Sequence, residues 1–248
     1  MLAFFSPALL SQSLFFKVVF LTMKDKKQVT QTFMVIAVVY VTCLLLSNLI
    51  AGKMWAVSGD ITLPAAVILF PITYIFGDIF TEVYGFKKAR IIIWLGFGCS
   101  FFAVAVYLIT IALPHPGFWE GQEAYRTVLG TTPRVAIASF VGYLFGEFSN
   151  SVVLSKLKVA TKGKKLWIRT ILSTLVGEGL DSIIFVMISF WGTMDNSTVL
   201  HMILYQYLFK VIYEALFTPI TYAVVNWLKR KEGIDVFDHD VKYTVIPE

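Results

Sequence analysis

Seven ionisable residues lie inside long apolar segments of the chain, where a charge is costly and usually serves a function. Six are carboxylates and one is a lysine: Asp78, Glu82, Glu147, Glu178, Asp181, Lys210 and Glu214. Six of the seven form pairs spaced three or four residues apart, so each pair shares one helix face. The excess of acids over cations requires protonation, water or a cationic ligand. We therefore expect a polar cavity between helices that binds a small solute.

Three of these residues have simpler interpretations. Lys210 and Glu214 are four residues apart and satisfy each other if they form a structural ion pair. Glu82 lies close to Lys87 and Lys88 at a segment end, so it is equally well explained as a solvated charge. Two asparagines in the apolar segments, Asn48 and Asn150, are either ligand contacts or hydrogen-bonding residues between helices.

Motifs for catalysis are missing from the sequence. There is no nucleotide-binding G-x-x-x-x-G-K-[ST] loop, no H-E-x-x-H and no G-x-S-x-G. The histidines, His115, His201 and His239, fall in connections or the tail, and the two cysteines lack C-x-x-C spacing. We expect a protein that is not an enzyme and holds no metal or cofactor.

The composition is that of a membrane protein. Of 248 residues, 57% are hydrophobic and 15% charged, with mean hydropathy +0.74, whereas soluble domains are about 25% charged. At roughly 20 residues per crossing, six helices are predicted over 28–52, 63–84, 91–114, 135–154, 167–192 and 203–228. Open sheets cannot satisfy their backbone in lipid, and barrel alternation is absent. The fold class predicted is an all-α integral membrane protein with the lipid bilayer as its partner, and no nucleic acid is expected.

Basic residues set the predicted orientation. Seventeen lie before the first span or in alternate connections and the tail, against Lys53, Arg126 and Arg134 on the other side. The positive-inside rule then places both termini in the cytoplasm. We divide the chain into an N-terminal segment (1–31), a membrane domain (32–231) and a tail (232–248). Met23 is a second plausible translation start. If translation begins there, residues 1–22 are an extension.

Short patterns recur at similar offsets along the chain. Ser47-Asn48 is matched by Ser149-Asn150, and Gly77-Asp78 is matched by Gly177-Glu178. Two three-helix halves would be inverted relative to each other in the membrane, as in many carriers. The matches are short, so chance similarity is the competing explanation.

An ordered set of motifs between Thr32 and Lys231 resembles the bacterial queuosine precursor transporters, also grouped as vitamin uptake transporters. The first half carries Ser47-Asn48 and Gly77-Asp78-Ile79-Phe80-Thr81-Glu82. The second half carries Arg134-Val135-Ala136-Ile137-Ala138-Ser139-Phe140, Gly146-Glu147, Ser173-Thr174-Leu175-Val176-Gly177-Glu178-Gly179-Leu180-Asp181-Ser182, Phe190-Trp191 and Phe209-Lys210-Val211, with Pro219.

The resemblance implies a carrier that imports 7-deazaguanines such as preQ0 and preQ1, from which the cytoplasm makes queuosine in tRNA. A guanine-like edge offers adjacent N–H donors that a carboxylate can accept. In this hypothesis Asp78, Glu178 and Asp181 hold the base, and Lys210 contacts a carbonyl or neutralises an acid. The other candidate contacts are Asn48, Asn150, Tyr74, Trp191, Glu82, Glu147 and Glu214.

Other functions share this composition. A substrate-binding component of an energy-coupling vitamin transporter, which needs a separate ATPase module, also has six spans, and a membrane scaffold or receptor predicts no uptake at all. Clustered carboxylates permit proton coupling, but facilitated diffusion requires none. The pattern is compatible with a monomer or a homodimer.

Overall fold

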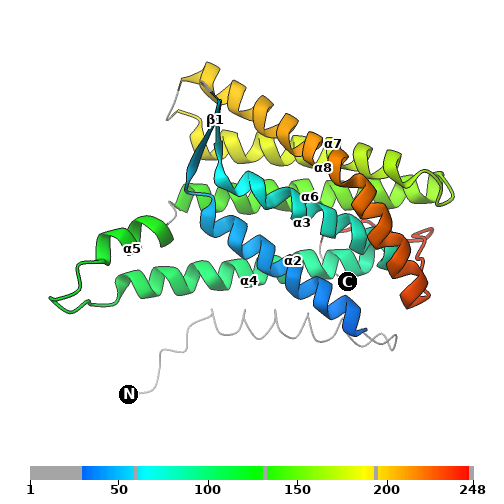
Figure 1. The fold of residues 1–248 in the computed structure, drawn as a ribbon, viewed down its shortest axis with the longest axis horizontal. Coiled ribbons are helices and arrows are strands. Elements are labelled where there is room, and N and C mark those ends of the chain that lie inside the picture. Colours follow the sequence, from blue (N-terminus) through cyan, green and yellow to red (C-terminus); the bar gives the residue numbers. More distant parts are fainter. Residues whose placement is uncertain (1–29, 59–60, 131–132, 193–194, 246–248) are drawn as a thin grey trace.

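The computed structural model describes residues 30–58, 61–130, 133–192 and 195–245. Its long helices are α2 (Gln31–Ile50), α3 (Phe70–Ile79), α4 (Phe86–Ala112), α6 (Pro133–Ala160), α7 (Leu166–Phe190) and α8 (Asn196–Glu232), with the short α5 (Gln122–Leu129). They form one bundle (Figure 1). The proposed extension, residues 1–22, lies outside the described residues.

Six segments of the described chain are long and apolar enough to cross a membrane: Gln31–Ile50, Ala65–Tyr84, Phe86–Ala112, Ile137–Ala160, Leu166–Phe190 and Asn196–Glu232. The predicted six-helix membrane fold is confirmed. The outer surface of the bundle is apolar and its interior holds charged residues beside a hydrophobic core, since Val35, Val38 and Phe101 are exposed while Asp78, Glu147 and Lys210 are buried. This distribution suits a protein whose outer surface contacts lipid.

The second span is central and is not one continuous helix. It is 78% buried, against 50% or less for the other five spans. It begins as a 3₁₀ turn (Ala65–Ile68), continues as α3 and ends in a π-helical turn (Phe80–Tyr84). Such π turns are frequent at functional sites. Gly85, with φ +84°, then reverses the chain into α4, in a conformation that suits glycine.

Small residues bring α6 and α7 into close contact. A Cβ atom at Gly146 would meet the carbonyl of Gly177, and one at Gly177 would meet the carbonyl of Gly146. Glycines at such positions let membrane helices approach backbone to backbone. Polar side chains of the two helices consequently face the same narrow interior.

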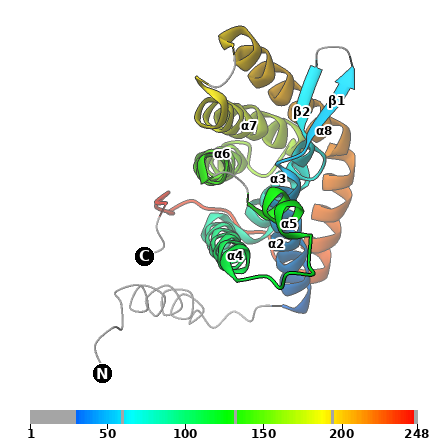
Figure 2. The ribbon, with the colours of Figure 1, turned by 90° about the vertical axis from the view of Figure 1, so that its left-hand side faces the viewer.

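Two elements were not predicted from sequence. Strands β1 (Met54–Ser58) and β2 (Ile61–Pro64) form an antiparallel hairpin in which Trp55 pairs with Leu63. The hairpin connects α2 to the second span, so it lies outside the spans where an open sheet is excluded. The other element is α5. Figures 1 and 2 show the hairpin and α5 at one end of the bundle, here named the hairpin end. The chain after α8 lies at the opposite end, here named the tail end.

Candidate functional site

Seven polar residues from four helices meet in the interior and are named the central cluster. They are Asp78 of α3, Glu147 and Asn150 of α6, Glu178 and Asp181 of α7, and Lys210 and Glu214 of α8, each 2% exposed or less. Glu147 is within electrostatic range of Asp78, Glu178, Asp181 and Glu214. The structure therefore brings together all the predicted intramembrane charges except Glu82.

The only lysine of the central cluster lies between two acids of α7. Its Nζ is 2.8 Å from Glu178 Oε2 and also donates to Asp181 Oδ2. The same Nζ lies 4.7 Å from the centre of the Phe70 ring, which adds a cation–π contact. The interpretation of Lys210 and Glu214 as an ion pair is wrong. Lys210 extends toward α7, and both carboxylate oxygens of Glu214 lack a hydrogen-bond partner among the described residues.

Asp78 and Asn150 join α3 to α6. Asn150 Nδ2 donates to Asp78 Oδ1 at 2.7 Å. The second oxygen of Asp78 and the amide oxygen of Asn150 have no hydrogen-bond partner within the described chain. This pair holds the carboxylate in place and leaves one acceptor on each side chain for a ligand.

Glu147 is buried without any hydrogen-bond partner among the described residues, at either oxygen. A Cβ atom at Gly77 would overlap its carboxylate, so α3 leaves space for it only because residue 77 is glycine. Tyr74, one turn earlier on α3, is 1% exposed, and its hydroxyl also lacks a partner in the described chain. Buried polar groups normally have partners. The central cluster is thus rich in acceptors that a ligand or protons can satisfy.

Two other predicted contacts take no part in the Lys210 ion pairs. Asn48 is half-buried on α2, and its Nδ2 donates to Ser100 Oγ at 3.3 Å. Trp191, at the end of α7, is 46% exposed, and its carbonyl accepts a hydrogen bond from Arg134. The structure brings Asn48 toward the central cluster through a shared cavity but does not bring Trp191 there.

Two cavities adjoin the site. One of about 30 Å³ is lined by Asn48, Asp181 and Lys210, which is room for about two waters. Another of about 290 Å³ lies among α2, α4 and α6 and is mainly apolar. Asn48 and Ser139 line both cavities. The smaller cavity is too small for a bicyclic base, so the interior is closed around the charges.

Sequence reasoning missed Gln206, which also lines the smaller cavity and is 4% exposed. An uncharged glutamine in an apolar segment costs less than a charge, so it is a weaker signal of function. Its spacing was the available signal, because Gln206 precedes Lys210 by four residues and shares its helix face.

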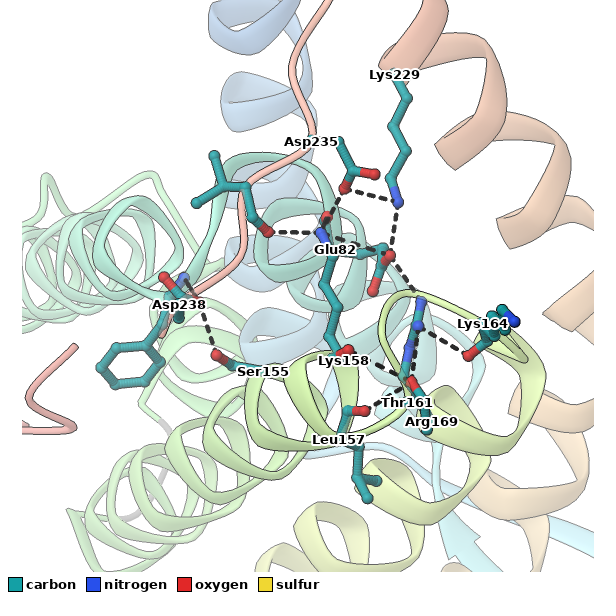
Figure 3. Close-up of polar contacts among 12 residues, drawn as sticks. Glu82, Ser155, Leu157, Lys158, Thr161, Lys164, Arg169, Lys229, Asp235 and Asp238 are labelled. Carbon is teal, nitrogen blue, oxygen red and sulfur yellow. Dashed lines mark hydrogen bonds and ion pairs between the residues drawn. The ribbon is translucent and has the colours of Figure 1, made fainter. Parts of the chain in front are cut away.

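Glu82 belongs to a second group, the tail-end cluster, which consists of Glu82, Lys158, Arg169, Lys229 and Asp235 (Figure 3). Glu82 Oε1 is 2.7 Å from both Arg169 Nη2 and Lys229 Nζ, and 3.7 Å from Lys158 Nζ. Its exposure is 0%. The interpretation of Glu82 as a solvated charge is wrong, because three cations from α6, α7 and α8 enclose it.

Asp235 joins the tail-end cluster from the chain after α8. Its Oδ1 lies 2.6 Å from Lys158 Nζ and 3.0 Å from Lys229 Nζ. Burial alone would raise the pKa of the Asp235 carboxyl, but Lys158 and Lys229 outweigh it and hold this pKa below the usual 3.8. In the described part of the chain, no group of three or more His, Cys, Asp or Glu side chains is arranged to hold a metal.

Six spans around a closed, acid-rich interior define a multi-pass α-helical membrane protein with a buried polar site. The family described as "Putative vitamin uptake transporter" matches residues 64–224, more than half of the chain. The chain belongs to this vitamin uptake transporter family.

Relatives agree with this assignment. The "Queuosine precursor transporter" of Escherichia coli (strain K12) is 28% identical over 65% of this chain and 72% of its own. A "Probable queuosine precursor transporter" of Bacillus subtilis (strain 168) is 28% identical over 62% and 68%. One of the same name from Haemophilus influenzae is 29% identical over 66% and 69%. No solved structure matches the chain.

Proposed function

We propose that this protein imports queuosine precursors, 7-deazaguanine bases such as preQ0 and preQ1, across the bacterial inner membrane. The names of three relatives support the substrate class. The observation that carries the proposal is the central cluster, where buried carboxylate oxygens of Asp78, Glu147 and Glu214 lack partners among the described residues. A guanine-like edge presents adjacent N–H donors, which carboxylates accept with good geometry.

The residues divide into two roles in this proposal. Asp78, Glu178 and Asp181 hold the polar edge of the base, with Asn48 and Asn150 completing its hydrogen bonds. Lys210 offsets the charge of Glu178 and Asp181, as its ion pairs support. Tyr74 supplies a flat neighbour for the ring, since it is buried beside Gly146 and Gly177.

Binding requires the interior to open, because the cavity beside Lys210 is only about 30 Å³. The cavity of about 290 Å³ approaches the lower end of small-molecule pocket volumes, about 300 Å³. It is lined by aromatic residues such as Phe97 and Phe140. Because Asn48 and Ser139 line both spaces, a flat base in the larger cavity would lie against residues that also border the charged cavity.

The proposed orientation places the tail end in the cytoplasm and the hairpin end outside. The basic residues concentrate at the tail end, as the positive-inside rule requires. Lys158, Arg169 and Lys229 belong to this set, although the structure shows that they also neutralise Glu82. The larger cavity then lies in the outer half of the membrane, because the late residues of α2 and α4 line it.

The experiment that tests this proposal measures the queuosine content of tRNA in cells that cannot synthesise preQ0 and lack their own carrier. These cells express this chain alone and are fed nanomolar preQ0 or preQ1. Restored queuosine supports a self-sufficient importer. Failure despite confirmed membrane insertion contradicts it, and restoration only with an added ATPase module would favour the substrate-binding component instead.

A further inference from the structure

Gln206 is a buried amide with an unused acceptor. It lies on α8 one turn before Lys210, is 4% exposed, and its Oε1 has no hydrogen-bond partner in the described chain. It lines the cavity of about 30 Å³ together with Asn48, Asp181 and Lys210. A buried acceptor without a partner needs an explanation, because such groups are nearly always satisfied.

The chemistry of an amide differs from that of its charged neighbours. Glu178 and Asp181 are engaged by Lys210, and the Asn48 amide already donates to Ser100. The oxygen of Gln206 remains free to accept from a neutral N–H donor. A site that hydrogen-bonds a substrate group rejects analogues lacking that group, because its own polar atom is then left unpaired.

We propose that Gln206 is a specificity-determining residue that accepts a hydrogen bond from the N–H edge of a flat heteroaromatic base. The base edge enters between Asn48, Asp181 and Lys210 as the cavity widens. This assignment rests on the proposed function and adds to it the residue that distinguishes a guanine-like edge from edges with fewer donors.

The test compares binding of three ligands to purified protein: 7-deazaguanine, 7-deazahypoxanthine, which lacks the exocyclic amine, and the N1-methyl analogue, which lacks the ring N–H. Wild type should prefer 7-deazaguanine over both. In Gln206→Leu the affinity for 7-deazaguanine should fall by about tenfold relative to the analogue that lacks the N–H bound by Gln206. The affinity for that analogue should stay nearly unchanged. Gln122→Leu, on α5 and bonded to the Ile111 carbonyl, should leave all ratios unchanged.

The outcomes are separable. Equal weakening of all three ligands in Gln206→Leu, or unchanged ratios, would overturn the assignment and leave the proposed function standing. Wild-type protein that binds none of the bases would overturn the proposed function and the assignment with it.

An independent observation concerns residues 234–245, which follow α8 and return along the tail end of the bundle. The Val236 N–H donates to the Val83 carbonyl at 3.3 Å, and Trp94 Nε1 donates to the Val245 carbonyl at 2.7 Å. Arg90 donates to the Thr244 carbonyl at 2.8 Å. The segment thus contacts the π turn and the first turns of α4.

Asp238 fixes the middle of this segment. Its Oδ2 accepts from the Phe86 N–H at 2.9 Å and from Ser155 Oγ at 2.6 Å, and it is 7% exposed. Gly85 before α4 has no side chain to cap the helix, so the carboxylate of Asp238, 152 residues after Phe86, performs this role. A Cβ atom at Gly85 would collide with Val236.

We infer that residues 234–245 form a gate that closes the tail end and moves aside when substrate leaves. The same segment reaches the tail-end cluster through Asp235, which pairs with Lys158 and Lys229 (Figure 3). Contacts from α4, α6 and α8 therefore converge on one strap across the end of the central span. This inference rests on the proposed transport function.

The test fixes the strap in place with a disulfide. Val83→Cys and Val236→Cys are combined in a Cys43→Ser/Cys99→Ser background, because a backbone hydrogen bond holds these two positions next to each other. Oxidation, verified by a gel-mobility shift, should reduce uptake at least tenfold, and reductant should restore it. Each single-cysteine variant should be unaffected by oxidant.

Binding of 7-deazaguanine should survive the cross-link, since the closed end is opposite the larger cavity. Full uptake by verified cross-linked protein would show that the strap is a fixed structural element and would overturn the gate. Absence of uptake by the reduced protein and by wild type would instead count against the proposed function and, with it, the gate.

Discussion

The amide of Asn150 on α6 donates a 2.7 Å hydrogen bond to the Asp78 carboxylate on α3. The two residues are 72 positions apart in the chain and are both buried. Under the proposed repeat, Asn150 corresponds to Asn48 and Asp78 to Glu178. Asn48 instead bonds Ser100, and Glu178 pairs with Lys210. The residues that the proposed repeat would equate therefore have different partners.

Asp78→Asn should reduce uptake by roughly tenfold or more while membrane expression stays normal, because a charged acceptor is replaced by a neutral amide. Queuosine in tRNA measures the effect. The exchange variant Asp78→Asn/Asn150→Asp keeps a hydrogen bond between the helices, with its donor now on α3 and the charge moved to α6. Full uptake by the single variant would remove Asp78 from the substrate site.

Lys210→Met should destabilise the protein by about 3–5 kcal/mol, because it leaves Glu178 and Asp181 buried without their cation. Thermal unfolding in detergent measures the change. Lys87→Met, at an exposed position of α4, is the matched control and should leave the midpoint unchanged. Adding Glu178→Gln and Asp181→Asn to Lys210→Met should recover much of the stability without recovering uptake. A stable Lys210→Met protein would contradict this account.

The spans could be predicted from sequence because hydrophobic length is a local property. The central cluster could be expected too, since Asp78, Glu178 and Lys210 are costly in lipid and favour a shared interior. Their partners could not be predicted. The four-residue spacing along α8 indicates an ion pair between Lys210 and Glu214. In the structure the long lysine side chain instead reaches two acids on α7.

The tail end shows the same limit more strongly. Lys87 and Lys88 are the cations nearest to Glu82 in sequence, but Arg169 and Lys229, 87 and 147 residues away, bind it. The return of the chain over the bundle to place Asp238 at the start of α4 also depends on long-range contacts. Neither arrangement has a periodic pattern that hydropathy or spacing can detect.

Gly77→Ala should impair both stability and uptake, because the added methyl group overlaps the Glu147 carboxylate. We expect a loss of about 1–3 kcal/mol, as for other overpacked interiors. Gly179→Ala on α7 is the control, since its Cβ would meet only Tyr207, at 3.5 Å. That change should be neutral or stabilising by about 0.5–1 kcal/mol. Similar unfolding midpoints for both variants would show that Glu147 moves freely.

Stability should depend on pH through Asp235. Its pKa is held below the usual 3.8 in the folded protein by Lys158 and Lys229. A lowered folded-state pKa contributes stability that is present above the unfolded value and is lost as pH falls through the folded value. The difference in unfolding midpoint between wild type and Asp235→Asn should therefore be constant from pH 7 to about 5 and shrink below about 4. A difference that persists unchanged at pH 3 would contradict the role of this charge.

Glu82→Gln should be among the most destabilising single changes at the tail end, by about 3–5 kcal/mol. It removes the one carboxylate that Arg169, Lys229 and Lys158 share, and Arg169 and Lys158 are almost fully buried. Glu123→Gln tests the same chemical change at the surface, where Glu123 and Arg126 form a pair with side chains 79% and 56% exposed. That pair should contribute about 1 kcal/mol or less. Equal shifts in the two unfolding midpoints would mean that burial does not govern the Glu82 contacts. A large shift confined to Glu82→Gln would establish that this carboxylate holds α6, α7 and α8 together at the tail end.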